Sequence, residues 1–317
     1  MYKEPIFLEA VFMERIWGGT KLKLLFNYNI PSNKTGEAWV IAAHPNGSSQ
    51  VKNGPLMGEN LSDIWTNHPR LFGKNKTEGQ FPLLVKILDA DEYLSVQVHP
   101  DDEYARNVAG ERYGKTECWY ILDCDENAEI IFGHHALSKE QFLKMVEDND
   151  WDQLLKRQQV EKGDFIYVPS GTIHAIGKGI VLLETQQNSD ITYRIYDYDR
   201  KDNSGQKREL HIESAMDVIT FPHEETELNF SQSKVADLMV NRLIQTQYFT
   251  VYHWNLNGKV PNPLFADYLL FTVIDGEGEL IIDSQHYTVT KGDNFILPKT
   301  VESYELQGEL EMIVSHE

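Results

Sequence analysis

The sequence predicts a mainly β protein, built from two tandem antiparallel β-barrels or jelly rolls with helical insertions. Many short strand-like runs are separated by Gly, Pro, Asn and Asp clusters, and few segments have helical periodicity. The segment KGDFIYVP at 162–169 also recurs as KGDNFILP at 291–298. In each copy a Gly-Asp turn precedes an apolar run that ends at Pro. Because a whole turn-strand-turn unit is repeated, we expect two copies of one β fold.

The individual elements follow from local patterns. Expected strands cover residues 81–88, 93–99, 117–122, 129–132, 165–168, 180–183 and 191–196. Expected helices cover 61–65, 101–109 and 138–146. The last of these begins with a capping-box pattern at Ser138 and places Phe142, Leu143 and Val146 on one face.

The domain organisation is predicted from the repeat and from one weakly patterned stretch. Residues 221–233 are acidic and polar, which is typical of a linker. The predicted division assigns residues 1–133 and 159–225 to a first β domain. Residues 134–158 form a helical insertion in it, and residues 234–317 form a second β domain.

The charge balance narrows the choice of partners. The 317 residues include 29 Lys and Arg against 49 Asp and Glu, for a formal net charge of -20. A surface with this much negative charge repels nucleic acid and anionic membranes. Neither is therefore an expected partner. If the ligand is phosphorylated, the chain must therefore gather its few cationic side chains locally.

The expected location is the cytoplasm. No apolar stretch approaches the roughly 18 to 20 residues needed to span a bilayer. The N-terminal residues have no basic start followed by a long apolar run, so no signal peptide is expected. The two cysteines, Cys118 and Cys124, are not in a CxxC pattern, and their low number fits a reducing compartment.

Three polar segments could hold a metal. In the run 94–100, Ser95, Gln97 and His99 alternate with apolar residues and share one strand face, which could also be the solvated face of a surface strand. Downstream, Gly163-x5-Pro169-x-Gly171-x2-His174 places a second histidine after a glycine turn. Between them, the segment 114–120 opens a strand with Glu117.

These segments resemble the two motifs of the cupin superfamily. The second motif is matched from Gly163 to His174, although Lys178 replaces its usual trailing Asn, and Gln97 replaces the first histidine of the first motif. The segments SVQVHPD at 95–101 and GKTECWY at 114–120 are similar to type I phosphomannose isomerases in particular. Segments 15–19, 36–39, 169–176 and 186–194 are similar to that family too, so the resemblance to its short bacterial form covers almost the whole chain.

The resemblance implies one Zn²⁺ per chain, with Gln97, His99, Glu117 and His174 as its ligands. Two imidazoles and two oxygen donors suit Zn²⁺, although Fe²⁺ or Mn²⁺ would accept the same set. In the second repeat copy, Ser303 stands where His174 stands in the first. The second β domain is therefore expected to hold no metal and to be structural.

The resemblance also implies an aldose–ketose isomerase that interconverts mannose 6-phosphate and fructose 6-phosphate through an enediol or enediolate. The expected catalytic residues are Arg194, Lys115, Glu184 and Asp190. The expected substrate-binding residues are Trp17, Lys86, Ser95 and Arg200. Glu184 or Asp190 is either the general base or a group that orients Arg194 or Lys115, and Trp17 packs either against the sugar or in the core. Lys86, Lys115, Arg194 and Arg200 would supply the local basic cluster that a phosphate requires.

Three other functions remain as alternatives. A non-catalytic zinc cupin could bind sugars or regulate transcription, although no basic surface or helix-turn-helix pattern is evident and Lys115 and Arg194 adjoin the ligands. An iron-dependent cupin dioxygenase usually has a histidine at the position of Gln97. A phosphoglucose isomerase of the same fold would differ mainly in its stereochemistry at C2.

Overall fold

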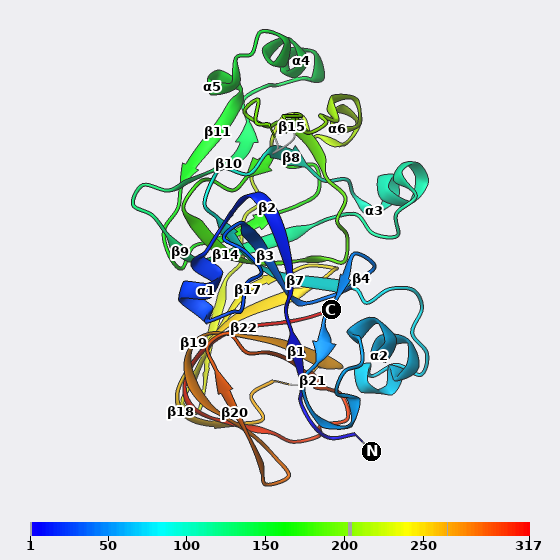
Figure 1. Ribbon diagram of the computed structural model, residues 1–317, viewed down its shortest axis with the longest axis vertical. Coiled ribbons are helices and arrows are strands. Elements are labelled where there is room, and N and C mark those ends of the chain that lie inside the picture. The colour runs from blue at the N-terminus through cyan, green and yellow to red at the C-terminus, as the bar shows by residue number, and fades with distance from the viewer. Residues whose placement is uncertain (1, 202–204, 265) are drawn as a thin grey trace.

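Two β regions are stacked along the long axis of the molecule (Figure 1). The computed structural model describes residues 2–201, 205–264 and 266–317. The first β region carries most of the helices, and the second contains the C-terminal third of the chain (Figure 1). The predicted mainly β fold is confirmed.

The first β region consists of two sheets and a small hairpin. One sheet has the order β12 (Phe165–Val168), β9 (Glu117–Cys124), β14 (Ile180–Gln187), β7 (Leu83–Ala90), β2 (Val11–Gly19) and β3 (Thr35–Ile41). The other has the order β11 (Leu155–Gln159), β10 (Glu129–His134), β13 (His174–Ala175), β8 (Val96–Val98) and β15 (Tyr193–Tyr196). The hairpin pairs β4 (Ala43–His44) with β5 (Gly47–Ser48).

Most of the short helices flank these sheets, whereas α2 (Leu61–Asn67) lies beside the second β region (Figure 1). The helices are α1 (Lys21–Phe26), α2, α3 (Asp102–Tyr104), α4 (Lys139–Glu147), α5 (Trp151–Leu154) and α6 (Ile212–Val218), with 3-10 turns η1 (Gly54–Leu56) and η2 (Pro69–Phe72) and a π-helical turn η3 (Ala105–Ala109). The three predicted helices correspond to α2, α3 with η3, and α4. The Ser138 hydroxyl caps α4 by accepting a hydrogen bond from the backbone N–H of Gln141. Among the described helices, none is both long and apolar enough to cross a bilayer.

The second β region is one nine-stranded sheet. Its order is β16 (Ser231–Val235), β17 (Leu238–Gln245), β18 (Thr250–Pro261), β22 (Glu305–His316), β19 (Tyr268–Ile282), β21 (Asn294–Pro298), β1 (Ile6–Glu9) and β6 (Gln50–Val51), with β20 (Gln285–Thr290) on β19. Two of these strands, β1 and β6, come from the N-terminal part of the chain. The sheet therefore ties the beginning of the chain to its end, which the sequence pattern did not indicate.

The sequence repeat corresponds to two equivalent turns. Gly163 and Gly292 have φ values of 95° and 93°, and each begins the turn before a short strand, β12 or β21. The Gly163 N–H donates to the carbonyl of Ile121 on β9, and the Gly292 N–H donates to the carbonyl of Val273 on β19, each at 2.9 Å. Each copy thus places its turn against the equivalent neighbouring strand, and the predicted pair of tandem β folds is confirmed. In the described residues each sheet order has two free ends, so the sheets do not close into barrels.

The two faces of the six-stranded sheet meet different cores. Leu88, Trp119 and Leu182 point into the core of the first β region. Their neighbours in the same strands, which include Ile87 and Leu183, point the other way into a core shared with residues of the second β region. Because side chains alternate along a strand, the sheet has one face for the site and one face for the second region.

Candidate metal centre and active site

Two imidazoles and a carboxylate meet inside the first β region. His99 follows β8, Glu117 opens β9 and His174 opens β13. One ligand atom from each lies within 4.8 Å of the others, and all three side chains are buried. The Glu117 carboxylate lies 3.6 Å from His99 Nε2 through Oε2 and 3.5 Å from His174 Nε2 through Oε1. Among the described residues this is the one such group of His, Cys, Asp and Glu.

The imidazoles are held with Nε2 directed at the carboxylate. His99 Nδ1 lies 2.8 Å from the carbonyl of Ile191, and His174 Nδ1 lies 2.9 Å from the carbonyl of Thr172. A carbonyl only accepts, so Nδ1 must carry the proton and Nε2 keeps its lone pair. Burial lowers the pKa of both rings, that of His174 to about 4, with the charge of Lys115 adding to the effect. Both rings are thus neutral and oriented as metal-bound histidines are.

Gln97 completes a set of four donors. It lies opposite His174 in the pairing of β8 with β13, and its Nε2 atom is 3.3 Å from His174 Nε2. The two ends of the amide exchange by rotation about the last torsion, so Gln97 can present Oε1 at this place. Glu117 Oε2 is buried, and its near partner among the described residues is the Lys115 ammonium, which lies 2.6 Å from it and 3.1 Å from His99 Nε2. Two neutral imidazoles, a carboxylate and an amide oxygen fit a divalent metal such as zinc.

A glycine turn places His174. Gly171 has φ of 83°, and its N–H donates to the carbonyl of His99 at 2.9 Å. A Cβ atom on Gly171 would lie 2.5 Å from Thr220 Oγ1 and 2.9 Å from the Val218 carbonyl oxygen. The turn thus requires glycine for its backbone angle and for its close packing. Its hydrogen bond links the two histidine-bearing segments directly.

Two lysines and a second carboxylate adjoin the ligand set. Lys115 Nζ lies 2.6 Å from Glu117 Oε2 and 4.0 Å from Glu184 Oε1, while Lys86 Nζ lies 3.3 Å from the same Glu184 oxygen. The indole N–H of Trp119 donates to both carboxylates, at 3.0 and 3.2 Å. Burial alone would lower the pKa of Lys115, but Glu117 and Glu184 raise it overall. Burial raises the pKa of Glu184, and the charge of Glu117 adds to this.

These groups open into a pocket of about 420 Å³. Its lining contains five cationic side chains, Arg15, Lys86, Lys115, Arg194 and Arg208, and four acidic ones, Glu14, Glu37, Glu184 and Asp190. The apolar and neutral polar part of the wall includes Trp17, Leu88, Leu94, Ser95, Gln97, Ile176 and Thr192. The pocket thus has a small excess of positive charge within a chain whose formal charge is -20. This meets the requirement for anion binding that the composition imposes.

Most of the residues predicted for the site line this pocket. Of the predicted catalytic and substrate-binding side chains, Lys115, Arg194, Glu184, Asp190, Trp17, Lys86 and Ser95 are in its wall. Arg200 is not among the lining residues. Its guanidinium instead donates to the backbone carbonyl of Tyr93 and pairs with the carboxylate of Asp197.

Four charged residues that line the pocket were not predicted from the sequence: Glu14, Arg15, Glu37 and Arg208. Glu37, on the fully buried strand β3, accepts hydrogen bonds from Trp39 Nε1 at 2.6 Å and Arg15 Nε at 2.7 Å. Burial alone would raise the pKa of Glu37, but Lys86 and Arg15 lower it overall. Glu37 could have been identified in the sequence, because it is a carboxylate in an otherwise apolar strand pattern. Arg208 lies outside any predicted strand, so no comparable pattern marks it.

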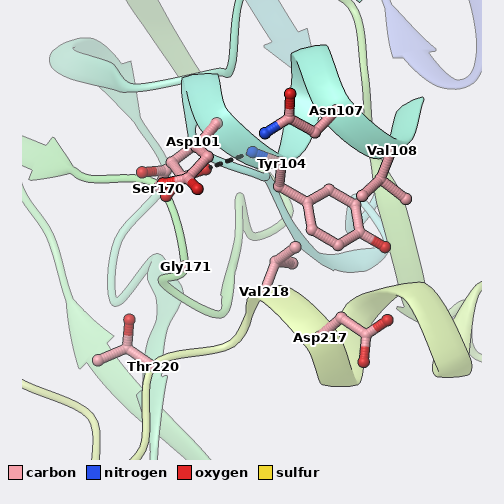
Figure 2. Close-up of a pocket in the computed structure, with 10 residues that line it drawn as sticks. Asp101, Tyr104, Asn107, Val108, Ser170, Gly171, Asp217, Val218 and Thr220 are labelled. Atoms are coloured by element: carbon pink, nitrogen blue, oxygen red, sulfur yellow. Dashed lines mark hydrogen bonds between the residues drawn. The ribbon is translucent and has the colours of Figure 1, made fainter. Parts of the chain in front are cut away.

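A second pocket, of about 380 Å³, lies between α3, η3 and α6 (Figure 2). It includes the Ser170–Gly171 turn, so it adjoins the segment that places His174. Its charged lining consists of Asp101, Glu103 and Asp217, and the Asp101 side chain caps α3 by accepting from the N–H of Tyr104. Three carboxylates repel an anionic ligand, so this pocket does not suit a phosphorylated sugar.

The fold and the site together define a cupin-type protein with a buried His-Glu-His centre that opens into a cationic pocket. Two family models match the chain: phosphomannose isomerase type I, catalytic domain, over residues 6–133, and mannose-6-phosphate isomerase, cupin domain, over residues 239–317.

Relatives of known name cover the chain from end to end. Mannose-6-phosphate isomerase ManA of Bacillus subtilis is 51% identical over 100% of both chains, and a mannose-6-phosphate isomerase of Streptococcus mutans is 50% identical over 99% of this chain and 98% of its own. The crystal structure of the mannose 6-phosphate isomerase from Bacillus subtilis matches with a TM-score of 0.96 at 47% identity, covering 99% of this chain and 100% of that one. The chain belongs to the type I mannose-6-phosphate isomerase family, and it is an aldose–ketose isomerase.

Proposed function

We propose that this chain interconverts mannose 6-phosphate and fructose 6-phosphate, with one Zn²⁺ held by Gln97, His99, Glu117 and His174. The observation that carries the proposal is the buried His-Glu-His group beside a cationic pocket, in a chain about half identical to mannose-6-phosphate isomerases over its whole length. The comparisons favour this function over a sugar-binding cupin or a dioxygenase.

The donor set supports zinc. Two neutral nitrogen donors and two oxygen donors are typical of zinc sites, and a single carboxylate leaves the bound cation a net positive charge. When bound, the metal would supply Lewis acidity, which stabilises negative charge on a substrate oxygen. The backbone carbonyls that accept from Nδ1 of His99 and His174 fix the orientation of both rings and would leave Nε2 of each available to a bound cation.

Lys115 is the residue we assign to charge stabilisation. During isomerisation a proton moves between C2 and C1 while negative charge builds up on the carbonyl oxygen. Lys115 is buried, lines the pocket and keeps its proton because Glu117 and Glu184 raise its pKa. A fixed ammonium in a buried site stabilises such charge without reorganisation of solvent.

Glu184 is our first candidate for the general base. Burial raises its pKa, which moves the carboxylate toward the neutral range where a base is effective. Asp190 is the alternative, since it also lines the pocket but is exposed. Glu184→Gln should retain zinc and lose at least about a hundredfold in kcat. If Asp190→Asn instead causes that loss while Glu184→Gln does not, the assignment passes to Asp190.

We assign the remaining pocket residues to substrate positioning. Arg194 Nε donates to Ser95 Oγ at 3.2 Å, so these two side chains act as a unit on one wall. Trp17 is almost fully buried but forms part of the wall, which suits packing against the sugar ring. Lys86 adds positive charge inside the pocket. Arg200, which was expected to do the same, pairs with Asp197 and is not among the lining residues, so we assign it no contact with the substrate.

We also propose a partner, a cellular location and a role for each domain. The partner is a small sugar phosphate, with no nucleic acid or membrane involved, and the location is the cytoplasm, where free thiols such as those of Cys118 and Cys124 stay reduced. The catalytic cupin domain comprises residues 1–133 and 159–225, the helical insertion 134–158, and the degenerate C-terminal cupin domain 234–317. Strands β1 and β6 are exceptions to this division, because β1 pairs with β21 and β6 pairs with β1.

The decisive experiment measures metal content and turnover on one purified sample. We expect about one zinc per chain and formation of fructose 6-phosphate from mannose 6-phosphate that stops when a chelator is added and returns with zinc. Glucose 6-phosphate, offered at the same concentration, should react far more slowly. Zinc without turnover would favour a binding protein, and iron with oxygen uptake would favour a dioxygenase.

A further inference from the structure

Three guanidinium groups gather around one carboxylate beside the pocket. Arg200 and Arg208 both pair with Asp197, and Arg194 lies near enough for the charges of Arg208 and Arg200 to add to burial in lowering its pKa. Asp197 is 5% exposed in its side chain. The cluster contains three positive charges and one negative charge, so its net charge is +2.

The two arginines that Asp197 holds are placed differently. Arg208 donates to Asp197 through Nε at 2.8 Å and through Nη2 at 2.6 Å, which is a two-bond pairing that fixes the plane of the guanidinium. Its Nη1 has no hydrogen bond to any described residue. Arg200 also donates to Asp197, but it has a further bond to the Tyr93 carbonyl. Arg208 lines the active-site pocket and Arg200 does not.

The backbone brings Arg208 next to Arg194. The N–H of Arg194 donates to His211 Nδ1 at 3.1 Å, and the N–H of His211 donates to the carbonyl of Arg194 at 2.7 Å. The Arg194 guanidinium donates through Nη1 to the carbonyl of Glu209 at 2.9 Å. The segment that follows Arg208 is thus hydrogen-bonded along β15 at Arg194, and both guanidinium groups reach the same wall of the pocket.

The position of this pair suits one end of a sugar phosphate. Arg194 lies opposite Gln97 in the pairing of β15 with β8, and its Nε donates to the hydroxyl of Ser95, two residues before Gln97. Two residues of an extended strand span about 6 to 7 Å. A hexose phosphate with its carbonyl end at the metal centre extends over a comparable length, so its phosphate would arrive at the arginines.

We propose that Arg208, oriented by Asp197 beside Arg194, binds the phosphate group of the substrate and thereby selects phosphorylated sugars. The assignment rests on the proposed isomerase function. Asp197 is a positioning residue in this scheme, because it acts only through Arg208. Arg200 serves to neutralise and hold Asp197, and the substrate does not touch it.

The test compares Arg208→Gln with its matched control Arg200→Gln. Both variants remove one guanidinium from Asp197, but only the first removes a group from the pocket wall. For Arg208→Gln we expect KM for mannose 6-phosphate to rise about 10- to 100-fold, with kcat within about threefold of the parent. Arg200→Gln should keep KM within about threefold. Equal changes in the two variants, or an unchanged KM in Arg208→Gln, would overturn the proposal.

Binding of inorganic phosphate to the zinc-loaded protein, measured by calorimetry, gives a readout independent of turnover. Phosphate should bind the parent and the Arg200→Gln variant alike and bind Arg208→Gln at least tenfold more weakly, and a thermal unfolding scan checks that each variant is folded. If phosphate binding depends on Arg208 but the parent does not isomerise mannose 6-phosphate, the proposed function fails and the anion site stands. If the parent isomerises and phosphate binding ignores Arg208, the site assignment fails alone.

Discussion

Lys86 and Glu184 lie directly opposite each other in the pairing of β7 with β14, and their side chains form an ion pair of 3.3 Å. Both side chains are 4% exposed. The ammonium of Lys86 also lies over the ring of Trp39, 5.1 Å from its centre. The pair is thus part of the sheet register and also part of the wall of the active-site pocket.

Removal of one partner of this pair should destabilise the protein. Lys86→Met leaves Glu184 buried with only the more distant Lys115 as a counter-charge, so we expect the free energy of unfolding to fall by about 3 kcal/mol. Urea titration monitored by circular dichroism measures this. Lys144→Met, which removes the exposed pair with Asp148, is the control and should leave the midpoint unchanged. Equal midpoints for the two variants would contradict the prediction.

Substitution of a proposed ligand should remove metal and activity together. His174→Ala deletes one of the two imidazole donors, so elemental analysis should find little zinc and turnover should fall with it. His253→Ala is a matched control, because His253 also pairs with a carboxylate, Glu311 at 2.7 Å, but lies in the second β region. That variant should retain about one zinc per chain. Full zinc content in His174→Ala would exclude His174 from the ligand set.

The glycine turn offers a comparison within one motif. Gly171 and Gly163 both have positive φ, but a Cβ on Gly171 meets Thr220 and the Val218 carbonyl, whereas a Cβ on Gly163 meets nothing within 4 Å. Gly163→Ala should cost about 1 kcal/mol of stability from its backbone angle alone. Gly171→Ala should cost more and should also weaken zinc binding, since this turn places His174. Thermal unfolding with zinc analysis checks both, and equal effects would argue against the steric contribution.

The Asp197 pairing predicts a specific pH dependence. Burial alone would raise the pKa of Asp197, but the bonds from Arg208 and Arg200 lower it below its ordinary 3.8. A carboxyl with a lowered folded-state pKa contributes stability that is present above the unfolded-state value and lost as pH falls through the folded-state value. Asp197→Asn should therefore be less stable than the parent at pH 7, and the difference should shrink below about pH 4. Urea unfolding at both pH values measures it, and a constant difference would contradict the pairing.

Much of the site was predictable because short segments carry it. Gln97 and His99 alternate on one strand face, and His174 follows a glycine turn, so each could be assigned from its local pattern and from the family resemblance. Lys115 could be placed with Glu117 for the same reason. The structure brings these residues together.

Other residues could not be assigned because their partners are distant in sequence. Glu37 becomes a pocket residue only when β3 pairs with β7 and brings it near Lys86. Arg200 matched a family position, but the chain beyond Asp197 turns through two residues with positive φ, Tyr198 and Asp199, and Arg208 lines the pocket instead. Neither outcome follows from a local pattern.

The sequence by itself determined the β architecture, the repeat, the family and the residues proposed as metal ligands, because strand alternation, turn glycines and motif spacing are local properties. Only the tertiary structure decided which charged side chains share the pocket and which strands extend the second sheet, where β1 pairs with β21. Those features depend on strand register and on chain reversals that join segments far apart. In a chain of net charge -20, the placement of a few arginines and lysines decides where an anion can bind.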